Sequence, residues 1–196
     1  MTLSSPNRMI WSCFRSIHRN IENIDTCTNE DTIKDIVAST IVLSVTAVET
    51  FINMYFRVLV EEEKYNSYKD MVISDSISKD GVRAKGLEQK LNKWPNQILG
   101  KNINFNTGIG KEFNDLRKKR NALTHFTSDY ETLIIDNIII KGLANTEAFD
   151  SLNKSEAIMA YKISKEFLAH ILLLSGTKKD KIHHAIHQWT GIVPEK

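Results

Sequence analysis

A long stretch of regularly spaced apolar residues constrains the fold of this chain more than any other feature. From Thr32 to about Lys64, apolar side chains recur every three or four residues over many turns, which is the period of an α-helix. The β-branched residues between Ile41 and Val48 would also suit a strand, but a helical period that persists this long outweighs local propensity. We therefore expect one long, largely buried helix with the rest of the chain packed around it.

Further amphipathic segments predict an all-α fold. Apolar residues at helical spacing predict additional helices over residues 7–24, 81–94, 110–126, 153–174 and 178–189. The second of these should stop at Pro95, because proline cannot donate a helix hydrogen bond. Three prolines and eight glycines are few for a turn-rich β architecture. We expect a single-domain, up-and-down bundle of about five to six helices, with a core over residues 32–174 and the two terminal helices packed on it.

A short segment after the central helix departs from the helical pattern. Residues 132–140, TLIIDNIII, form two β-branched runs on either side of Asp136 and Asn137. Such a pair favours a tight turn between two strands. We expect a small β-hairpin inserted into the bundle here.

Composition excludes several classes of protein. A formal net charge of +2 is too small for nucleic-acid binding through the overall field, so such binding would need a local patch. Cys13 and Cys27 are too few for a disulfide framework and indicate a reducing compartment. The start of the chain has no apolar segment of signal-peptide length, and no apolar run approaches the roughly 18 residues of a membrane span. We expect a cytoplasmic protein without membrane contact.

The segment from Gly110 to Phe126, GKEFNDLRKKRNALTHF, places a charge where an apolar residue is expected. Its apolar stripe follows the spacing 4, 3, 4, 3 and comprises Ile109, Phe113, Leu116, Arg120 and Leu123. Burying an unpaired guanidinium costs several kcal/mol, so Arg120 needs a carboxylate, a cleft or a partner chain. Glu49 is the only acid between Asp35 and Glu61 on the long helix. We therefore expect Glu49 to approach Arg120.

His125 follows Arg120 by five residues and does not share its face. Five residues on a straight helix correspond to roughly 140°, whereas Arg117, Asn121 and His125 stack at four-residue spacing. Arg120 and His125 could converge if the helix end unwinds or if the arginine reaches around the helix. They could also meet if two copies of the helix pair across a two-fold axis and form a composite cleft.

Two segments resemble the HEPN domain family. RKKRNALTHF resembles the family signature of Arg, Asn, three further residues and His, here Arg120, Asn121 and His125. AVETFINMYF resembles an earlier helix of the family, with an acid and an Asn at the positions of Glu49 and Asn53. The architectural resemblance spans residues 32–174. It implies an all-helical domain that cleaves RNA without metal or cofactor, at a site formed by two paired domains.

The implied roles suit the chemistry of these residues. His125 would act as base toward a ribose 2′-OH or as acid toward the leaving 5′-oxygen, and Arg120 would bind the phosphoryl oxygens as charge builds. Asn121 would orient the phosphate or His125, with Glu49 and Asn53 in support. The cations next to the motif, Arg117, Lys118 and Lys119, would contact RNA phosphates. The implied partners are RNA, a second copy of the chain, and an antitoxin or phage-defence protein.

Simpler interpretations stand beside these. Arg120 and Glu49 could form a purely structural pair, His125 could be an ordinary helix-end histidine, and the RKKR run could be a solvated face. Many family members lack catalysis, which makes a non-catalytic interaction module the alternative function. The histidines of KIHHAIHQW, His183, His184 and His187, have helical ligand spacing but no acid that completes a known metal motif, so we expect no metal site.

Overall fold

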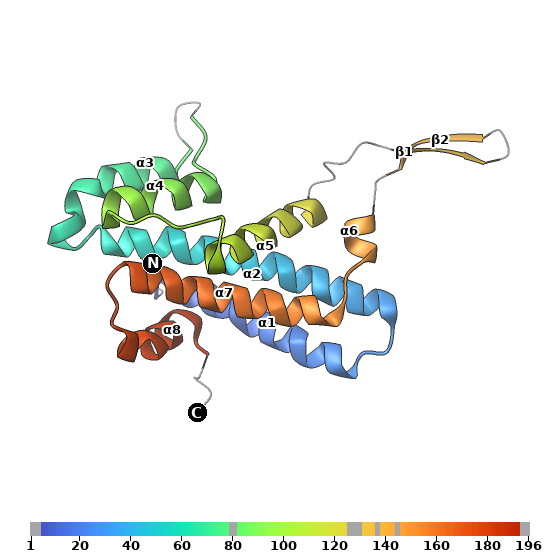
Figure 1. The fold of residues 1–196 in the computed structure, drawn as a ribbon, viewed down its shortest axis with the longest axis horizontal. Helices are drawn as coiled ribbons and strands as arrows, with labels where there is room; N and C mark the ends of the chain where they lie inside the picture. The colour runs from blue at the N-terminus through green and yellow to red at the C-terminus, as the bar shows by residue number, and fades with distance from the viewer. Residues whose placement is uncertain (1–4, 79–81, 125–130, 136–137, 144–145, 193–196) are drawn as a thin grey trace.

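The computed structural model describes residues 5–78, 82–124, 131–135, 138–143 and 146–192, and it is an all-α bundle as the sequence predicts (Figure 1). Four long helices alternate in direction along the chain: α1 (Arg8–Thr26), α2 (Glu30–Leu59), α5 (Gly108–Thr124) and α7 (Lys154–Leu174). The described residues contain eight α-helices in all, more than the five to six expected, because several short helices connect the long ones.

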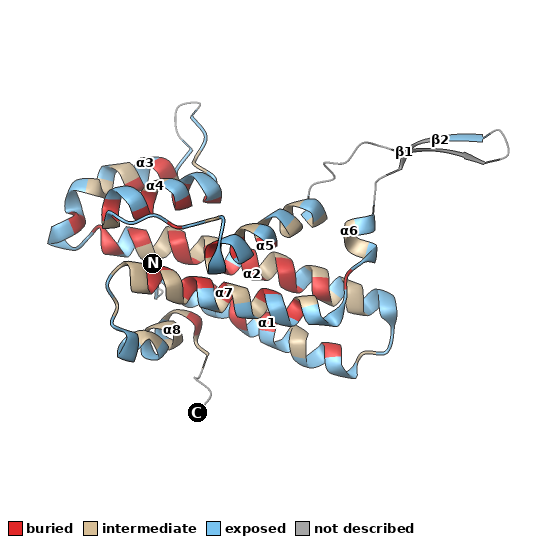
Figure 2. Ribbon diagram, viewed as in Figure 1, coloured by how far each residue is buried: buried red, intermediate tan, exposed pale blue. Residues whose placement is uncertain are grey.

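The predicted long helix, α2, is the centre of the bundle. It packs against α1, α5 and α7, and its inward residues are almost completely buried, among them Val37, Ile41, Val45, Val48, Phe51 and Phe56 (Figure 2). Its mean hydropathy reaches 1.7 over 18 residues, which corrects the expectation that no segment is apolar enough to span a bilayer. Uncharged Thr and Ser residues interrupt the apolar run but leave this average high. Half of that window is buried against the other helices, as expected for the core helix of a bundle.

The two terminal helices contribute directly to the core. Ile10, Phe14 and Ile17 of α1 are fully buried, and α1 lies along α2 over much of its length. The C-terminal helix α8 (Ile182–Thr190) packs on α7 and α1. A 3₁₀ turn, Lys179–Lys181, precedes it, so the predicted helix over residues 178–189 begins somewhat later than expected.

A group of short helices connects α2 to α5 along the chain and packs on α2 (Figure 1). It comprises the 3₁₀ helix η1 (Glu63–Tyr68), α3 (Lys69–Ser76) and α4 (Leu87–Leu99). The prediction that Pro95 ends the helix is wrong, because Pro95 lies inside α4. Burial of Trp94 and Ile98 on either side of the proline holds the helix together although one backbone hydrogen bond is missing. The helix ends instead at Gly100, which adopts a left-handed conformation at φ 64°.

The predicted hairpin is present. Strands β1 (Glu131–Ile135) and β2 (Ile138–Leu143) pair antiparallel, with Ile135 opposite Ile138 and Leu133 opposite Ile140. The expected turn residues, 136–137, lie outside the described residues. Figure 1 shows the strands extending away from the helices, between α5 and the short helix α6 (Glu147–Asp150). The hairpin is therefore an insertion that does not form part of the bundle core.

The start of α5 is fixed by a close backbone approach. Gly108 has φ +57°, a left-handed conformation that favours glycine. Two residues later, Gly110 packs against the preceding loop, and a Cβ atom there would lie 2.1 Å from the carbonyl oxygen of Asn104. The loop and the first turn of α5 can approach this closely only because residue 110 has no side chain.

We predict that Gly110→Ala destabilises the fold by about 1–3 kcal/mol through this overlap. The sign is informative, because alanine in a helix would otherwise add roughly 1 kcal/mol of stability. Chemical denaturation measures the change. Gly86→Ser is the matched control, since a Cβ at Gly86 meets nothing within 4 Å and serine suits its N-cap position. Equal stability of Gly110→Ala and the wild type would contradict the prediction.

Candidate functional site

The basic run on α5 connects that helix to three neighbours. Three of its cations pair with acids from different helices: Arg117 with Glu88 of α4, Lys119 with Glu156 of α7, and Arg120 with Glu49 of α2. Successive residues on a helix point about 100° apart, so adjacent cations reach different helices. Lys118 faces outward, with 67% of its side chain exposed and only Asp115 of its own helix nearby, at 3.9 Å. The basic run thus serves mainly to position α5.

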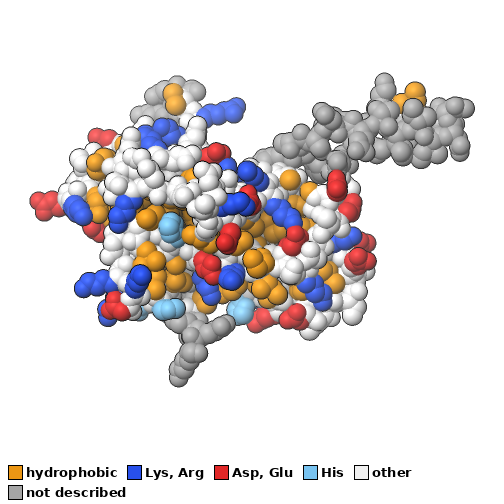
Figure 3. Space-filling view, in the orientation of Figure 1, with side chains coloured by type: hydrophobic (Ala, Val, Ile, Leu, Met, Phe, Trp, Pro, Cys, Tyr) orange, Lys and Arg blue, Asp and Glu red, His pale blue; other side chains and the backbone are white. Residues whose placement is uncertain are grey.

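The surface over α5 and α4 accordingly carries mixed charge. Figure 3 shows Lys and Arg side chains interspersed with Asp and Glu side chains there, rather than a broad patch of one sign. The Arg117–Glu88 pair is short, at 2.7 Å between Nη1 and Oε2. A phosphate that binds Arg117 or Lys119 would therefore have to compete with a carboxylate of the same chain.

The predicted approach of Glu49 to Arg120 is confirmed. Arg120 Nη2 lies 3.9 Å from Glu49 Oε2, a distance within ion-pair range but too long for a hydrogen bond. The Arg120 side chain is 22% exposed, and its Nε atom is buried without a hydrogen-bond partner among the described residues. Arg120 is thus held near a carboxylate while several of its donors stay unused.

Sequence reasoning missed Lys90 of α4. This lysine is only 4% exposed, and its Nζ donates a 2.8 Å hydrogen bond to Oδ1 of Asn53, one turn after Glu49 on α2. Nζ also lies 5.4 Å above the ring of Trp94. Burial lowers the pKa of Lys90, and the nearby charge of Glu49 opposes this effect. The predicted supporting residues, Glu49 and Asn53, therefore each contact a cation from a different helix.

The position of Lys90 could have been found from the sequence. It follows Leu87 by three residues and precedes Trp94 by four, which places it on the apolar stripe of its helix. Arg120 was singled out as a charged residue on the apolar stripe of a helix, and Lys90 meets the same criterion.

A second charge cluster fixes α4 against α3. The buried carboxylate of Asp75 accepts hydrogen bonds from Lys93 at 2.8 Å and from Trp94 Nε1 at 3.0 Å, and Lys85 pairs with it at 3.2 Å. Burial alone would raise the pKa of Asp75, but these donors together lower it. This cluster sets the position of α4 and, with it, the position of Lys90.

The structure does not bring together all of the predicted site residues. Asn121 is half-buried on α5, and its side chain forms no hydrogen bond with another described residue. His125 lies outside the described residues. The residues that the structure does bring together are Glu49, Asn53, Lys90 and Arg120, at the junction of α2, α4 and α5.

The C-terminal histidines do not form a metal centre. Among the described residues, no group of three or more His, Cys, Asp or Glu side chains is arranged to bind a metal ion. His183 and His184 are exposed, and Nδ1 of His187 lies 2.7 Å from the carbonyl oxygen of Ile192. His187 is therefore engaged with the backbone that follows α8.

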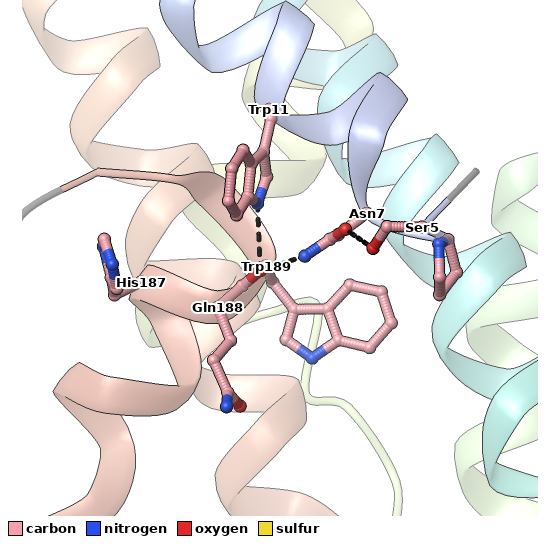
Figure 4. A pocket seen from close by; sticks show the side chains of 7 residues that line it. Ser5, Asn7, Trp11, His187, Gln188 and Trp189 are labelled. Carbon is pink, nitrogen blue, oxygen red and sulfur yellow. Dashed lines mark hydrogen bonds between the residues drawn. The ribbon is translucent and has the colours of Figure 1, made fainter.

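A hollow of about 410 Å³ lies between the start of α1 and α8 (Figure 4). The side chains of Trp11 and Asn7 both donate to the carbonyl oxygen of Gln188, the former at 2.9 Å. His187 and Trp189 also line it. These contacts join the terminal helices, and the hollow includes none of the residues of the Arg120 cluster.

Comparison with protein-family models, with curated proteins and with solved structures found no match for the chain.

We predict that Asp75→Asn lowers the free energy of unfolding at pH 7 by about 1.5–3 kcal/mol, the usual value of hydrogen bonds to a charged group. The folded-state pKa of Asp75 is lowered, so its contribution is present above the unfolded pKa of about 3.9 and is lost as the pH falls through the folded value. The difference between the wild type and the variant should therefore shrink below about pH 4.

Denaturant titrations at several pH values measure this difference. Asp70→Asn removes an exposed carboxylate from the same helix and serves as the control. A loss of stability that is equal for the two variants, or independent of pH, would refute the role assigned to Asp75.

Proposed function

We propose that this chain is a metal-independent endoribonuclease of the HEPN type, acting as a homodimer in the cytoplasm as a toxin or phage-defence effector. The observation that best supports this proposal is the state of Arg120. Its guanidinium is held near Glu49 at 3.9 Å, its Nε atom has no partner among the described residues, and it lies five residues before His125. A guanidinium whose Nε has no partner among the described residues, together with a histidine five residues later in the sequence, suits phosphoryl transfer.

The reaction would be a transesterification within RNA. His125 accepts the proton of a ribose 2′-OH as its oxygen attacks the adjacent phosphorus, or donates a proton to the 5′-oxygen as it leaves. Arg120 stabilises the charge on the non-bridging oxygens, and Asn121 orients the phosphate or the histidine. The products are a 2′,3′-cyclic phosphate and a 5′-hydroxyl, and no metal is required.

A dimer would bring the two groups of the motif together. The five-residue spacing of Arg120 and His125 corresponds to roughly 140° on a straight helix, so such a helix would direct them to different faces. Two helices related by a two-fold axis can each supply one of the groups to a shared cleft.

One observation favours the alternative, a non-catalytic helical module that binds an antitoxin or a defence-system protein. Arg117 and Lys119 are already paired with Glu88 and Glu156, so they contribute to the fold whether or not RNA binds. The same surface would then serve protein recognition.

We predict that the purified protein cleaves RNA in the presence of EDTA, and that Arg120→Ala and His125→Ala each reduce the rate by 10²-fold or more. That reduction is the usual effect of losing a general acid or base or a charge-stabilising donor. Gel analysis of total RNA, with detection of 2′,3′-cyclic phosphate ends, measures the activity. Lys154→Ala, an exposed change at the start of α7, is the control.

Three outcomes decide between the two functions. Cleavage that survives both substitutions, or that EDTA abolishes, excludes the proposed mechanism. Absence of cleavage with a stable, folded protein supports the interaction module. A monomer by light scattering during active cleavage would exclude the composite site.

We further predict that Lys118 contributes more to RNA binding than its paired neighbours do. Lys118→Gln should reduce the slope of log binding constant against log salt by about one phosphate contact, since this cation has no close interhelical partner. Lys119→Gln should change the salt slope less, but it should lower the free energy of unfolding because it removes the ion pair with Glu156 of α7. Filter binding of a single-stranded RNA at several salt concentrations, with thermal unfolding in parallel, measures both. Equal slopes for these two variants would contradict the assignment.

A further inference from the structure

Glu49 lies at the junction of α2, α4 and α5, near the half-buried Arg120 and the buried Lys90. Arg120 approaches it from α5 at 3.9 Å. Lys90 lies within its electrostatic influence from α4, anchored by Asn53 one helical turn away. Arg57 and Asp75 also act on Lys90, but the oxygens of Asp75 are engaged by Lys85, Lys93 and Trp94. The cluster therefore has an excess of positive charge.

The geometry of Arg120 is unusual for a half-buried arginine beside a carboxylate. Such pairs normally close to about 2.7–2.9 Å, often with two parallel hydrogen bonds. Here the closest approach is 3.9 Å and Nε is unsatisfied. The Glu49 side chain is 37% exposed, and a second cation, Lys90, is held by Asn53 one helical turn away and attracts the same carboxylate.

We propose that Lys90 is a positioning residue for Arg120: its charge, held by Asn53 one helical turn from Glu49, competes for the Glu49 carboxylate and leaves the Arg120 guanidinium underpaired and ready to bind an oxyanion. The inference rests on the proposed function in one respect, that the oxyanion in the cell is a phosphoryl group of RNA. The chemistry itself requires only an anion with phosphate geometry, and it can be tested with phosphate alone.

A purely structural role for Lys90 makes a different prediction. Its bond to Asn53 and its position over Trp94 would then only hold α4 against α2. Any substitution that preserves the fold would leave Arg120 and its affinity for anions unchanged. The two roles therefore differ in whether the surroundings of the Arg120 guanidinium change when Lys90 is replaced.

The test follows the Nε–Hε resonance of Arg120 by ¹⁵N NMR during titration with inorganic phosphate, the resonance being assigned by its loss in Arg120→Lys. In Lys90→Met we expect this resonance to shift as Arg120 closes onto Glu49, and phosphate affinity to fall about tenfold, equivalent to one charge-assisted hydrogen bond. Lys90→Arg should restore both values toward those of the wild type. Lys111→Met removes an exposed charge from α5 and should leave the resonance in place.

Several results would overturn the proposal. An unchanged Arg120 resonance and phosphate affinity in Lys90→Met would leave Lys90 with a structural role only. An equal loss of phosphate affinity in Lys111→Met would indicate a general effect of charge, and wild-type affinity in Arg120→Lys would place the phosphate elsewhere. Removing Lys90 also leaves the Asn53 side chain without this hydrogen bond, which lowers stability. Should Lys90→Met fail to fold, Lys90→Gln keeps a donor for Asn53 without the charge and is read in the same way.

None of these measurements depends on RNA cleavage. A chain that binds phosphate through Arg120 in a Lys90-dependent manner but cleaves no RNA would retain this inference and lose the proposed function. A chain that cleaves RNA while its Lys90 variants behave as the wild type would retain the function and lose the inference.

Discussion

The central helix α2 is apolar over most of its length, and Glu49 is its one charge between Asp35 and Arg57. Its side chain is 37% exposed, and it gives cations of the neighbouring helices a partner on an otherwise apolar helix. Arg120 of α5 pairs with it at 3.9 Å, and Lys90 of α4 is bonded to Asn53 one helical turn away. The orientation of α5 and the composition of the candidate site both depend on this position.

The charges on α5 show how one sequence feature can serve the fold and a site together. A run of four basic residues resembles a nucleic-acid patch when it is considered alone. In the structure three of them act as connections to α4, α7 and α2, and the acids that receive them come from three separate parts of the chain. Of these three, Arg120 has a buried Nε atom without a hydrogen-bond partner among the described residues. Pairing geometry, more than the number of cations, therefore selects the residue available to a ligand.

The sequence predicted the features that depend on periodicity and on the cost of burial. Helical spacing located the long helices, the turn pair at residues 136–137 located the hairpin, and the position of Arg120 on an apolar stripe identified Glu49 as its partner. Features that depend on tertiary packing were missed. Pro95 stays within α4 because its neighbours are buried, and α3 is too short for a clear period. The partners of Arg117 and Lys119 come from distant segments, which spacing alone cannot identify.

The ion pair between Lys119 and Glu156 bears on which segment of the chain can change in sequence. Glu156 also accepts from the backbone N–H of Asn153 at the start of α7, so the end of α5 and the first turn of α7 are joined side by side. The hairpin leaves and re-enters the bundle between these two points. The pair involves no residue of the strands, so substitutions in the hairpin are expected to leave the helices around Arg120 in place.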